Sequence, residues 1–338
     1  MRRTWLLSIP LLLLVAYLAG PAPASPILDK TMPAVPAAPV ELEAYINAKE
    51  ATQKIKPDNE ARIIWADSSR KKTKYAIVYL HGFSASQGEG APLHTDIARR
   101  FGCNLYLSRL AGHGLVTDNP FLHFTADEYW RSAREALAIG KQLGEQVILM
   151  GTSTGGTLAL LLAADYPEVH SLVLLSPNIA INDPNSWLVN NHWGLQVART
   201  VLNSDFVVSG DRRELYKKYW YSRYRIEGVV QLQELLEETM TEETFHKVKQ
   251  PVLMLYYYKD QVHQDSVVRV DAMLKMMEQL GTPANMKVSK AMPETGNHVI
   301  GSYIKSADVD GVKSEIATFL ENRLNMARRS LETENSSN

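Results

Sequence analysis

Cysteine is almost absent from this sequence: its 338 residues include a single one, Cys103. One cysteine cannot close an internal disulfide, and no group of histidines and cysteines has the spacing of a metal site. Charge of one sign is also missing, because 36 Lys and Arg nearly balance 37 Asp and Glu. Such a balance produces no overall field that would attract nucleic acid or an anionic membrane. No Gly-x-Gly-x-x-Gly follows a predicted strand, and Gly88-Glu89-Gly90 is too sparse for a phosphate loop. We therefore expect no cofactor, no metal and no nucleic-acid partner.

The longest apolar run lies at the N-terminus. Residues 6–18 are almost entirely apolar, Arg2 and Arg3 precede them, and Ala22-Pro23-Ala24 supplies small residues for cleavage. The run is shorter than the roughly 20 residues needed to span a bilayer. We therefore expect residues 1–24 to be a signal peptide or an uncleaved N-terminal anchor. This predicts a periplasmic or extracellular protein, with any membrane association through the N-terminus only.

Residues 146–164 combine a short apolar strand, a tight turn and a helix-forming stretch rich in leucine and alanine. The turn reads Gly151-Thr152-Ser153-Thr154-Gly155-Gly156. This arrangement is typical of a nucleophile elbow, in which the serine sits between strand and helix with its Oγ exposed. Glycines are needed around it because strand and helix approach closely, and the helix start favours a developing anion. A glycine-rich connection in a parallel sheet is the alternative interpretation. We predict Ser153 as a nucleophile.

An orienting acid should follow such a serine in the chain, and a histidine should follow the acid. The predicted strand 252–257 leads into Lys259-Asp260-Gln261. An acid just beyond the carboxyl end of a parallel strand lies where such sheets bind ligands. We therefore predict Asp260 as the acid. Asp265, which is better placed to cap the next helix, is the main competitor.

His298 is the predicted base because it comes third in the required order, in a loop after the last predicted strand. Its neutral imidazole would accept the proton of Ser153, and Asp260 would hold the tautomer. His263 and His246 also follow the serine. The first lies only three residues from the acid and the second precedes it, so both are less suitable.

The oxyanion hole should combine the backbone N–H after the nucleophile with one from an earlier strand–loop junction. The first is that of Thr154. The second is predicted at Phe83, since the strand 75–80 ends in His81-Gly82-Phe83 and Gly82 lets the backbone turn. We expect His81 to hold this loop in place. The Phe83 side chain should pack against its neighbours while the Phe83 backbone N–H binds the oxyanion.

These motifs resemble those of the α/β-hydrolase superfamily, within it the group of monoacylglycerol lipases, carboxylesterases and serine aminopeptidase-like proteins. The resemblance covers roughly residues 60 to 325 in matching order. Thr152 and Thr154 replace the bulkier residue and the Met common beside the serine in lipases, so substrate preference is not carried over. The motifs that carry the resemblance are His81-Gly82-Phe83, Ala111-Gly112-His113-Gly114, the elbow, Asp260-Gln261-Val262 and Gly296-Asn297-His298.

The order of predicted elements indicates an α/β-hydrolase fold: a mostly parallel sheet with helices on both faces and a helical cap insertion. We expect a tether and N-terminal helix at 25–58, the core at 59–176 and 250–326, the cap at 177–249, and a disordered tail at 327–338. The predicted strands are 61–65, 75–80, 104–107, 146–150, 171–175, 252–257 and 286–288, and the predicted helices are 41–56, 126–143, 157–165, 266–280 and 310–325.

The resemblance implies a serine hydrolase that cleaves small-molecule carboxylic esters. Trp187 and Trp193, in the aromatic-rich cap, are the candidate substrate-binding residues, although the aromatics could equally form the core of the cap. A peptidase or amidase is the main alternative, in which Glu237 or Glu238 of the cap would hold a substrate amine. A non-catalytic binding protein on the same fold is the third.

Overall fold

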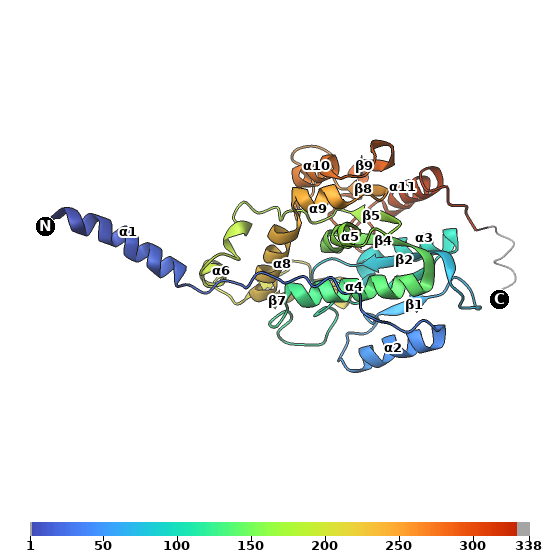
Figure 1. The fold of residues 1–338 in the computed structure, drawn as a ribbon, viewed down its shortest axis with the longest axis horizontal. Coiled ribbons are helices and arrows are strands. Elements are labelled where there is room, and N and C mark those ends of the chain that lie inside the picture. The colour runs from blue at the N-terminus through green and yellow to red at the C-terminus, as the bar shows by residue number, and fades with distance from the viewer. Residues whose placement is uncertain (1, 330–338) are drawn as a thin grey trace.

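A seven-stranded sheet with the order β1-β3-β2-β4-β5-β8-β9 forms the centre of the molecule (Figure 1). The computed structural model describes residues 2–329. Only β1 is antiparallel, to β3, and every other neighbouring pair is parallel. The predicted α/β-hydrolase fold with its mostly parallel sheet is confirmed. The strands are β1 (Arg62–Ile64), β2 (Thr73–Leu80), β3 (Asn104–Leu107), β4 (Gly144–Thr152), β5 (Ser171–Leu175), β8 (Val252–Tyr256) and β9 (Lys287–Ala291).

Helices cover both faces of the sheet because successive strand residues point to opposite sides and both sets are apolar. On β2, Val78 and Leu80 join the core under one layer of helices, whereas Ile77 and Tyr79 join the core under the other. The first layer contains α4 (Ala126–Leu143), α5 (Thr154–Asp165) and α10 (Val270–Gln279), and the second contains α3 (Leu93–Phe101) and α11 (Val309–Asn322).

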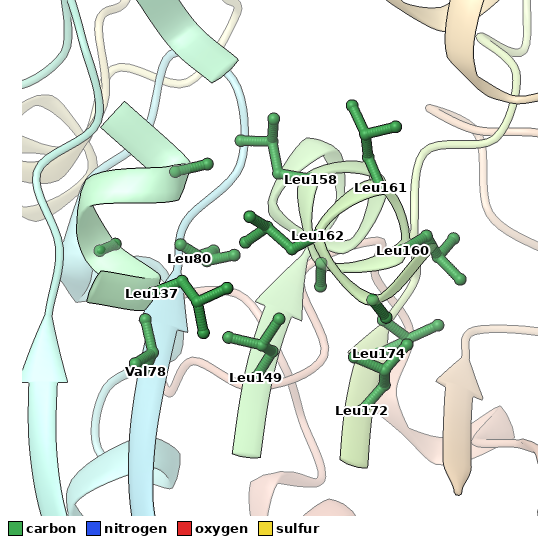
Figure 2. Close-up of a cluster of buried hydrophobic side chains, with 14 of the residues drawn as sticks. Val78, Leu80, Leu137, Leu149, Leu158, Leu160, Leu161, Leu162, Leu172 and Leu174 are labelled. Atoms are coloured by element: carbon green, nitrogen blue, oxygen red, sulfur yellow. The ribbon is translucent and has the colours of Figure 1, made fainter. Parts of the chain in front are cut away.

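The helix α5 is apolar on every side and is buried from Thr154 to Ala163. Leu158, Leu160 and Leu162 are fully buried. Figure 2 shows these leucines between the side chains of β2, β4, β5 and α4. Burial of each such leucine stabilises the fold by roughly 1.5–3 kcal/mol. This packing fixes the start of α5, where the predicted nucleophile lies.

A segment between β5 and β8 forms the predicted cap. It includes a small antiparallel ribbon of β6 (Phe206–Val208) and β7 (Arg223–Arg225) beside its helices. Its last helix, α9, packs against α5 and α10 on the core. The helices of the segment are α6 (Gly194–Leu202), α7 (Glu214–Tyr219), α8 (Ile226–Thr239) and α9 (Glu242–Lys247).

The N-terminal residues form the helix α1 (Arg2–Leu18), which extends away from the body of the molecule in Figure 1. Within residues 2–329, no helix combines the length and the apolar character that crossing a membrane requires. The short helix α2 (Pro39–Ala51) follows farther along the chain and buries Leu42 and Ile46 against the core.

Two segments near the ends of the chain contact the core. Instead of forming a loose tether, residues 25–38 lie against α4: the Trp130 indole donates to the Asp29 carbonyl at 2.7 Å, and Arg134 pairs with the Asp29 carboxylate at 2.9 Å. At the other end, the first residues of the predicted disordered tail are held, since the Arg329 amide donates to the Arg100 carbonyl. The rest of that tail, 330–338, lies outside the described residues.

Candidate active site

Ser153 occupies the sharp turn between β4 and α5. Its φ of 53° and ψ of −121° are strained for a non-glycine residue, and such strain costs about 1–3 kcal/mol. The predicted need for glycine is confirmed: a Cβ on Gly151 would lie 2.4 Å from the Gly155 carbonyl oxygen, and one on Gly155 would lie 1.9 Å from that of Leu80. The backbone therefore adopts the elbow geometry that the sequence predicts, with Ser153 at the first turn of a helix.

His298 and Asp265 form a buried pair. His298 Nδ1 lies 2.6 Å from Asp265 Oδ2, and the side chains are 8% and 0% exposed. The other carboxylate oxygen of Asp265 accepts the backbone N–H groups of Val267 and Val268. With one oxygen held by the backbone and the other facing the imidazole, the carboxylate fixes the orientation of the His298 ring.

The pair shifts the pKa values of both groups. Burial alone would lower the pKa of His298, but the charge and hydrogen bond of Asp265 and the charge of Glu89 raise it above the usual 6.5. For Asp265, burial works toward a higher pKa, and His298 with the two backbone N–H groups brings the pKa below its usual value. The pair therefore favours an ionised carboxylate beside a basic imidazole.

Asp260 does not contact His298, and its prediction as the orienting acid is wrong. Its side chain is 52% exposed, and its carboxylate accepts from the backbone N–H of Val262 and lies 3.0 Å from His263 Nδ1. Asp260 is thus the aspartate of a surface turn.

The loop after β8 explains the error. Residues 258–264 close on themselves, because Tyr258 and Gln264 form a bridge and the Lys259 amide donates to the His263 carbonyl. The amide of Asp265 then donates to the carbonyl of Tyr257. Asp265 therefore lies next to the end of β8 although residues 257–264 separate it from Tyr256, the last residue of the strand.

The loop after β2 is held by His81, as expected. His81 Nδ1 lies 3.0 Å from the Gly82 carbonyl oxygen, and the Leu110 amide donates to His81 Nε2 at 3.0 Å. Since Nε2 accepts, Nδ1 carries the proton and donates. Burial lowers the pKa of His81 to about 4, so the ring is neutral and stays in this tautomer. The side chain of Phe83 packs on Phe121 in a stacked arrangement, also as expected.

The predicted oxyanion donors are the amides of Phe83 and Thr154. Within the part of the chain that the structure describes, neither amide donates to a backbone or side-chain acceptor. Both residues line the cavity that contains Ser153. Two amides without an internal acceptor at the wall of a cavity are available to a ligand, and the oxyanion role stays a prediction.

Ser153 and His298 line the same cavity, whose volume is about 520 Å³. This volume lies in the range of small-molecule sites. Side chains of the cap line part of the cavity. Among the described residues, no three His, Cys, Asp or Glu side chains come together as metal ligands. The cap residues that line the cavity are Asn178, Ile181, Val207, Ser209, Tyr216, Trp220, Tyr224, Val229 and Leu232.

Trp187 and Trp193, predicted to bind substrate, lie elsewhere. They are 55% and 42% exposed and line a shallow hollow between α6 and the end of α1, where the Trp193 indole donates to the Ala16 carbonyl. Glu237 and Glu238, considered as ligands for a substrate amine, are exposed and do not line the cavity. Aromatic composition alone could not distinguish the aromatics at the cavity from those on the outer surface.

Glu89 is a member of the site that the sequence did not suggest. It lies in the 3₁₀ turn Gln87–Gly90, is 2% exposed and lines the cavity beside Ser153. The only local signal is an acid between two glycines shortly after the oxyanion loop. Such a pattern is common in exposed turns, so burial could not be inferred from it.

Comparisons with known proteins agree with the fold. A family model described as alpha/beta hydrolase family matches residues 77–303. A thermostable monoacylglycerol lipase of Bacillus sp. (strain H-257) is 30% identical over 108 residues, which are 32% of this chain and 42% of the lipase. The serine hydrolase BPHL of Homo sapiens is 26% identical over 157 residues, which are 44% of this chain and 50% of the human protein. The chain thus spans half or less of the curated relatives it matches.

Solved structures show the same fold at low identity. One of these structures comes from work on LipS and LipT, two metagenome-derived lipolytic enzymes. Its TM-score to this chain is 0.60 and its sequence identity is 17%, and the match covers 80% of this chain and 100% of that chain. Est1E from Butyrivibrio proteoclasticus with bound ferulic acid has a TM-score of 0.54 and 16% identity, with 79% and 95% covered. At this identity the similarity concerns the fold alone.

Proposed function

The chain belongs to the α/β-hydrolase family, and on that premise we propose that it hydrolyses carboxylic esters through an acyl-enzyme formed on Ser153. One observation carries the proposal. A serine in a strained elbow lines the same cavity as a histidine that is hydrogen-bonded to a buried aspartate. Nucleophile, base and orienting acid with these roles define the chemistry of a serine hydrolase.

In the first half-reaction, Ser153 Oγ attacks the ester carbonyl carbon while His298 Nε2 takes the hydroxyl proton. The resulting imidazolium is stabilised by the Asp265 carboxylate at Nδ1. His298 then gives the proton to the departing alcohol oxygen as the bond between carbonyl carbon and alcohol breaks. In the second half-reaction His298 removes a proton from water, whose oxygen attacks the acyl carbon. His298 then returns the proton to Ser153 Oγ as the bond between the acyl carbon and Oγ breaks and the acid is released.

The negative oxygen of each tetrahedral intermediate would be bound by the Phe83 and Thr154 amides. Both line the cavity, and Thr154 is the first residue of α5, where the helix dipole favours negative charge. One donor of this kind contributes roughly a factor of 10²–10³ to turnover. The arrangement therefore needs no cofactor for ester hydrolysis.

The cavity favours a substrate with an apolar portion. Its cap wall is dominated by aliphatic and aromatic side chains such as Tyr224, Val229 and Leu232. Esters with a short to medium acyl or alcohol group fit such a wall. Amide hydrolysis by a peptidase is less well supported, because the cap acids Glu237 and Glu238 do not line the cavity.

The experiment that tests the proposal combines a fluorophosphonate probe with p-nitrophenyl esters and aminoacyl anilides. We expect the probe to label the wild-type protein, and Ser153→Ala to abolish labelling and lower turnover by up to about 10⁶-fold. Ser266→Ala is the matched control, since this serine lines the cavity without taking part in the chemistry. Labelling that survives in Ser153→Ala would refute the assignment, and faster cleavage of anilides than of esters would favour the peptidase.

We also propose that the protein is exported, on the pattern of basic, apolar and small residues within 2–24. Intact-mass measurement of protein from the cell envelope and from the medium tests this. A mature chain that begins at Ser25 is expected for cleavage, and a full-length chain in the membrane fraction for an anchor. A full-length chain confined to the cytosol would contradict both forms of the proposal.

A further inference from the structure

Glu89 contacts the loop that carries one of the predicted oxyanion donors. The Gly82 amide donates to Glu89 Oε2 at 2.5 Å. A Cβ built on Gly82 would lie 2.8 Å from Glu89 Oε1 and 3.0 Å from the Cβ of Ser153. The buried carboxyl group and the nucleophile therefore lie against the same side of Gly82.

Hydrogen bonds hold both peptide groups that flank the Cα of Gly82. Its N–H is bound by Glu89, and its carbonyl oxygen faces the His81 ring at 3.0 Å and the Ala85 amide at 3.3 Å. A trans peptide is planar, with N–H and C=O pointing in opposite directions. Fixing the Gly82 carbonyl therefore fixes the direction of the Phe83 N–H, and fixing the Gly82 N–H prevents rotation of the preceding peptide.

His298, which becomes a cation in the proposed reaction, interacts with Glu89, and the cationic side chain of Lys305 lines the same cavity. Coulombic interaction links Glu89 and His298, and Glu89 contributes to the raised pKa of His298. The Trp220 side chain also favours the ionised form of the carboxyl group. The remaining titratable neighbours are Tyr79, Tyr129 and Tyr216, each with a pKa above its usual value because of burial and, secondarily, the charge of Glu89 or another acid.

Burial raises the pKa of Glu89 to about 7, while the Gly82 amide, His298 and Trp220 act in the opposite direction. The carboxyl group is therefore partly ionised near neutral pH. When it is ionised, it favours a positive charge on His298, which is the charge that appears when Ser153 transfers its proton.

We propose that Glu89 is a positioning residue of this site: it holds the Gly82 amide so that the Phe83 N–H faces the reacting carbonyl, and its charge favours the imidazolium form of His298. The part concerning the reacting carbonyl rests on the proposed ester hydrolysis. The part concerning His298 depends only on the folded structure.

Two variants separate the two roles. Glu89→Gln keeps an oxygen that can accept from Gly82 but removes the charge, whereas Glu89→Ala removes both. Glu135→Gln is the matched control, because Glu135 is also buried and hydrogen-bonded, to Tyr45 and Lys49, but lies outside the cavity. For each variant, kcat, KM and the pH profile of p-nitrophenyl butyrate hydrolysis are measured, and folding is followed by circular dichroism.

For Glu89→Ala we expect kcat to fall roughly 10²-fold with little change in KM, since a misdirected donor acts mainly on the transition state. For Glu89→Gln we expect a smaller loss and an acidic limb moved to lower pH by up to about one unit. The control should keep the wild-type pH profile. An unshifted limb in Glu89→Gln, with kcat of Glu89→Ala within threefold of wild type, would overturn the proposal.

Direct titration of the His298 imidazole by nuclear magnetic resonance makes the test independent of turnover, with His298→Gln to assign the signal. A lower His298 pKa in Glu89→Gln than in the wild type is expected even if no ester is cleaved. That result would refute the proposed ester hydrolysis and support the electrostatic role of Glu89. If Glu89→Ala does not fold, an unchanged His298 pKa in Glu89→Gln would still refute the proposal.

Discussion

Replacing Asp265 by Asn should disable the site through a change of histidine tautomer. In the wild type, Asp265 Oδ1 accepts two backbone N–H groups, those of Val267 and Val268, at 2.9 and 3.0 Å. In Asp265→Asn the amide oxygen must occupy this position, because an NH₂ group would face two donors. The NH₂ group is then left facing His298 Nδ1, where the carboxylate Oδ2 lies in the wild type.

An NH₂ group beside Nδ1 requires Nδ1 to accept, so the proton of the neutral ring moves to Nε2. A protonated Nε2 cannot take the proton of Ser153. Loss of the correct tautomer in a site of this type lowers kcat by roughly 10⁴-fold, or about 5 kcal/mol in activation free energy. The overall fold should persist, since the substitution is isosteric and the backbone N–H groups keep an acceptor.

The assay compares Asp265→Asn with Asp260→Asn in p-nitrophenyl ester turnover and in the rate of fluorophosphonate labelling. Because Asp260 is an exposed turn residue, its variant should stay within about twofold of wild type. A large loss in Asp260→Asn together with an active Asp265→Asn would refute the role of Asp265 as the acid that orients His298. Equal losses in both would show that the whole loop, and not the carboxylate on His298, controls the reaction.

Since only neutral His298 accepts a proton and its pKa is raised, kcat/KM should fall as pH decreases through an apparent pKa above 6.5, measured as a pH–rate profile. Leu232→Ala in the cavity wall should raise KM for longer-chain esters more than for acetyl esters, whereas Trp187→Ala should leave both KM values unchanged, in a chain-length series. The pKa of Glu89 rises on folding from 4.5 to about 7, so the folded state binds the proton more tightly. The free energy of unfolding should therefore decrease by up to about 3 kcal/mol between pH 4.5 and 7, and urea titrations should show this decrease in the wild type but not in Glu89→Gln.

Regular elements with a strong local pattern could be predicted from the sequence. The helix 126–143 and the strands 104–107 and 171–175 are observed with the predicted bounds. The side chain of Thr125, which precedes α4, accepts a hydrogen bond from the Glu128 amide. The helix also has an apolar face of helical spacing, and both signals are local. The helix α3 is not among the predicted helices: its apolar residues Leu93, Ile97 and Phe101 do recur at helical spacing, but its nine residues make only about two and a half turns, a short signal.

The residues of the site also differ in whether the sequence alone could predict them. Ser153 could be predicted because its strained turn requires Gly151 and Gly155, which lie two positions before and two positions after it in the sequence. The acid could not, because its position depends on how residues 258–264 close, and that closure depends on long-range geometry. A rule based only on where a strand ends does not distinguish two aspartates that lie five residues apart. Only the hydrogen bond of His298 to Asp265 distinguishes them.

The strained conformation of the nucleophile and the positions of its partners have separate physical origins. Ser153 keeps a conformation that costs about 1–3 kcal/mol because α5 cannot move without exposing leucines that contribute roughly 1.5–3 kcal/mol each. His298 and Asp265, in contrast, lie on loops that short hydrogen bonds hold in place, and Glu89 lies on a single 3₁₀ turn. Local opening of such loops requires less free energy than global unfolding. Conditions that weaken the protein should therefore separate the base from the nucleophile, and so stop turnover, before the elbow itself loses its shape.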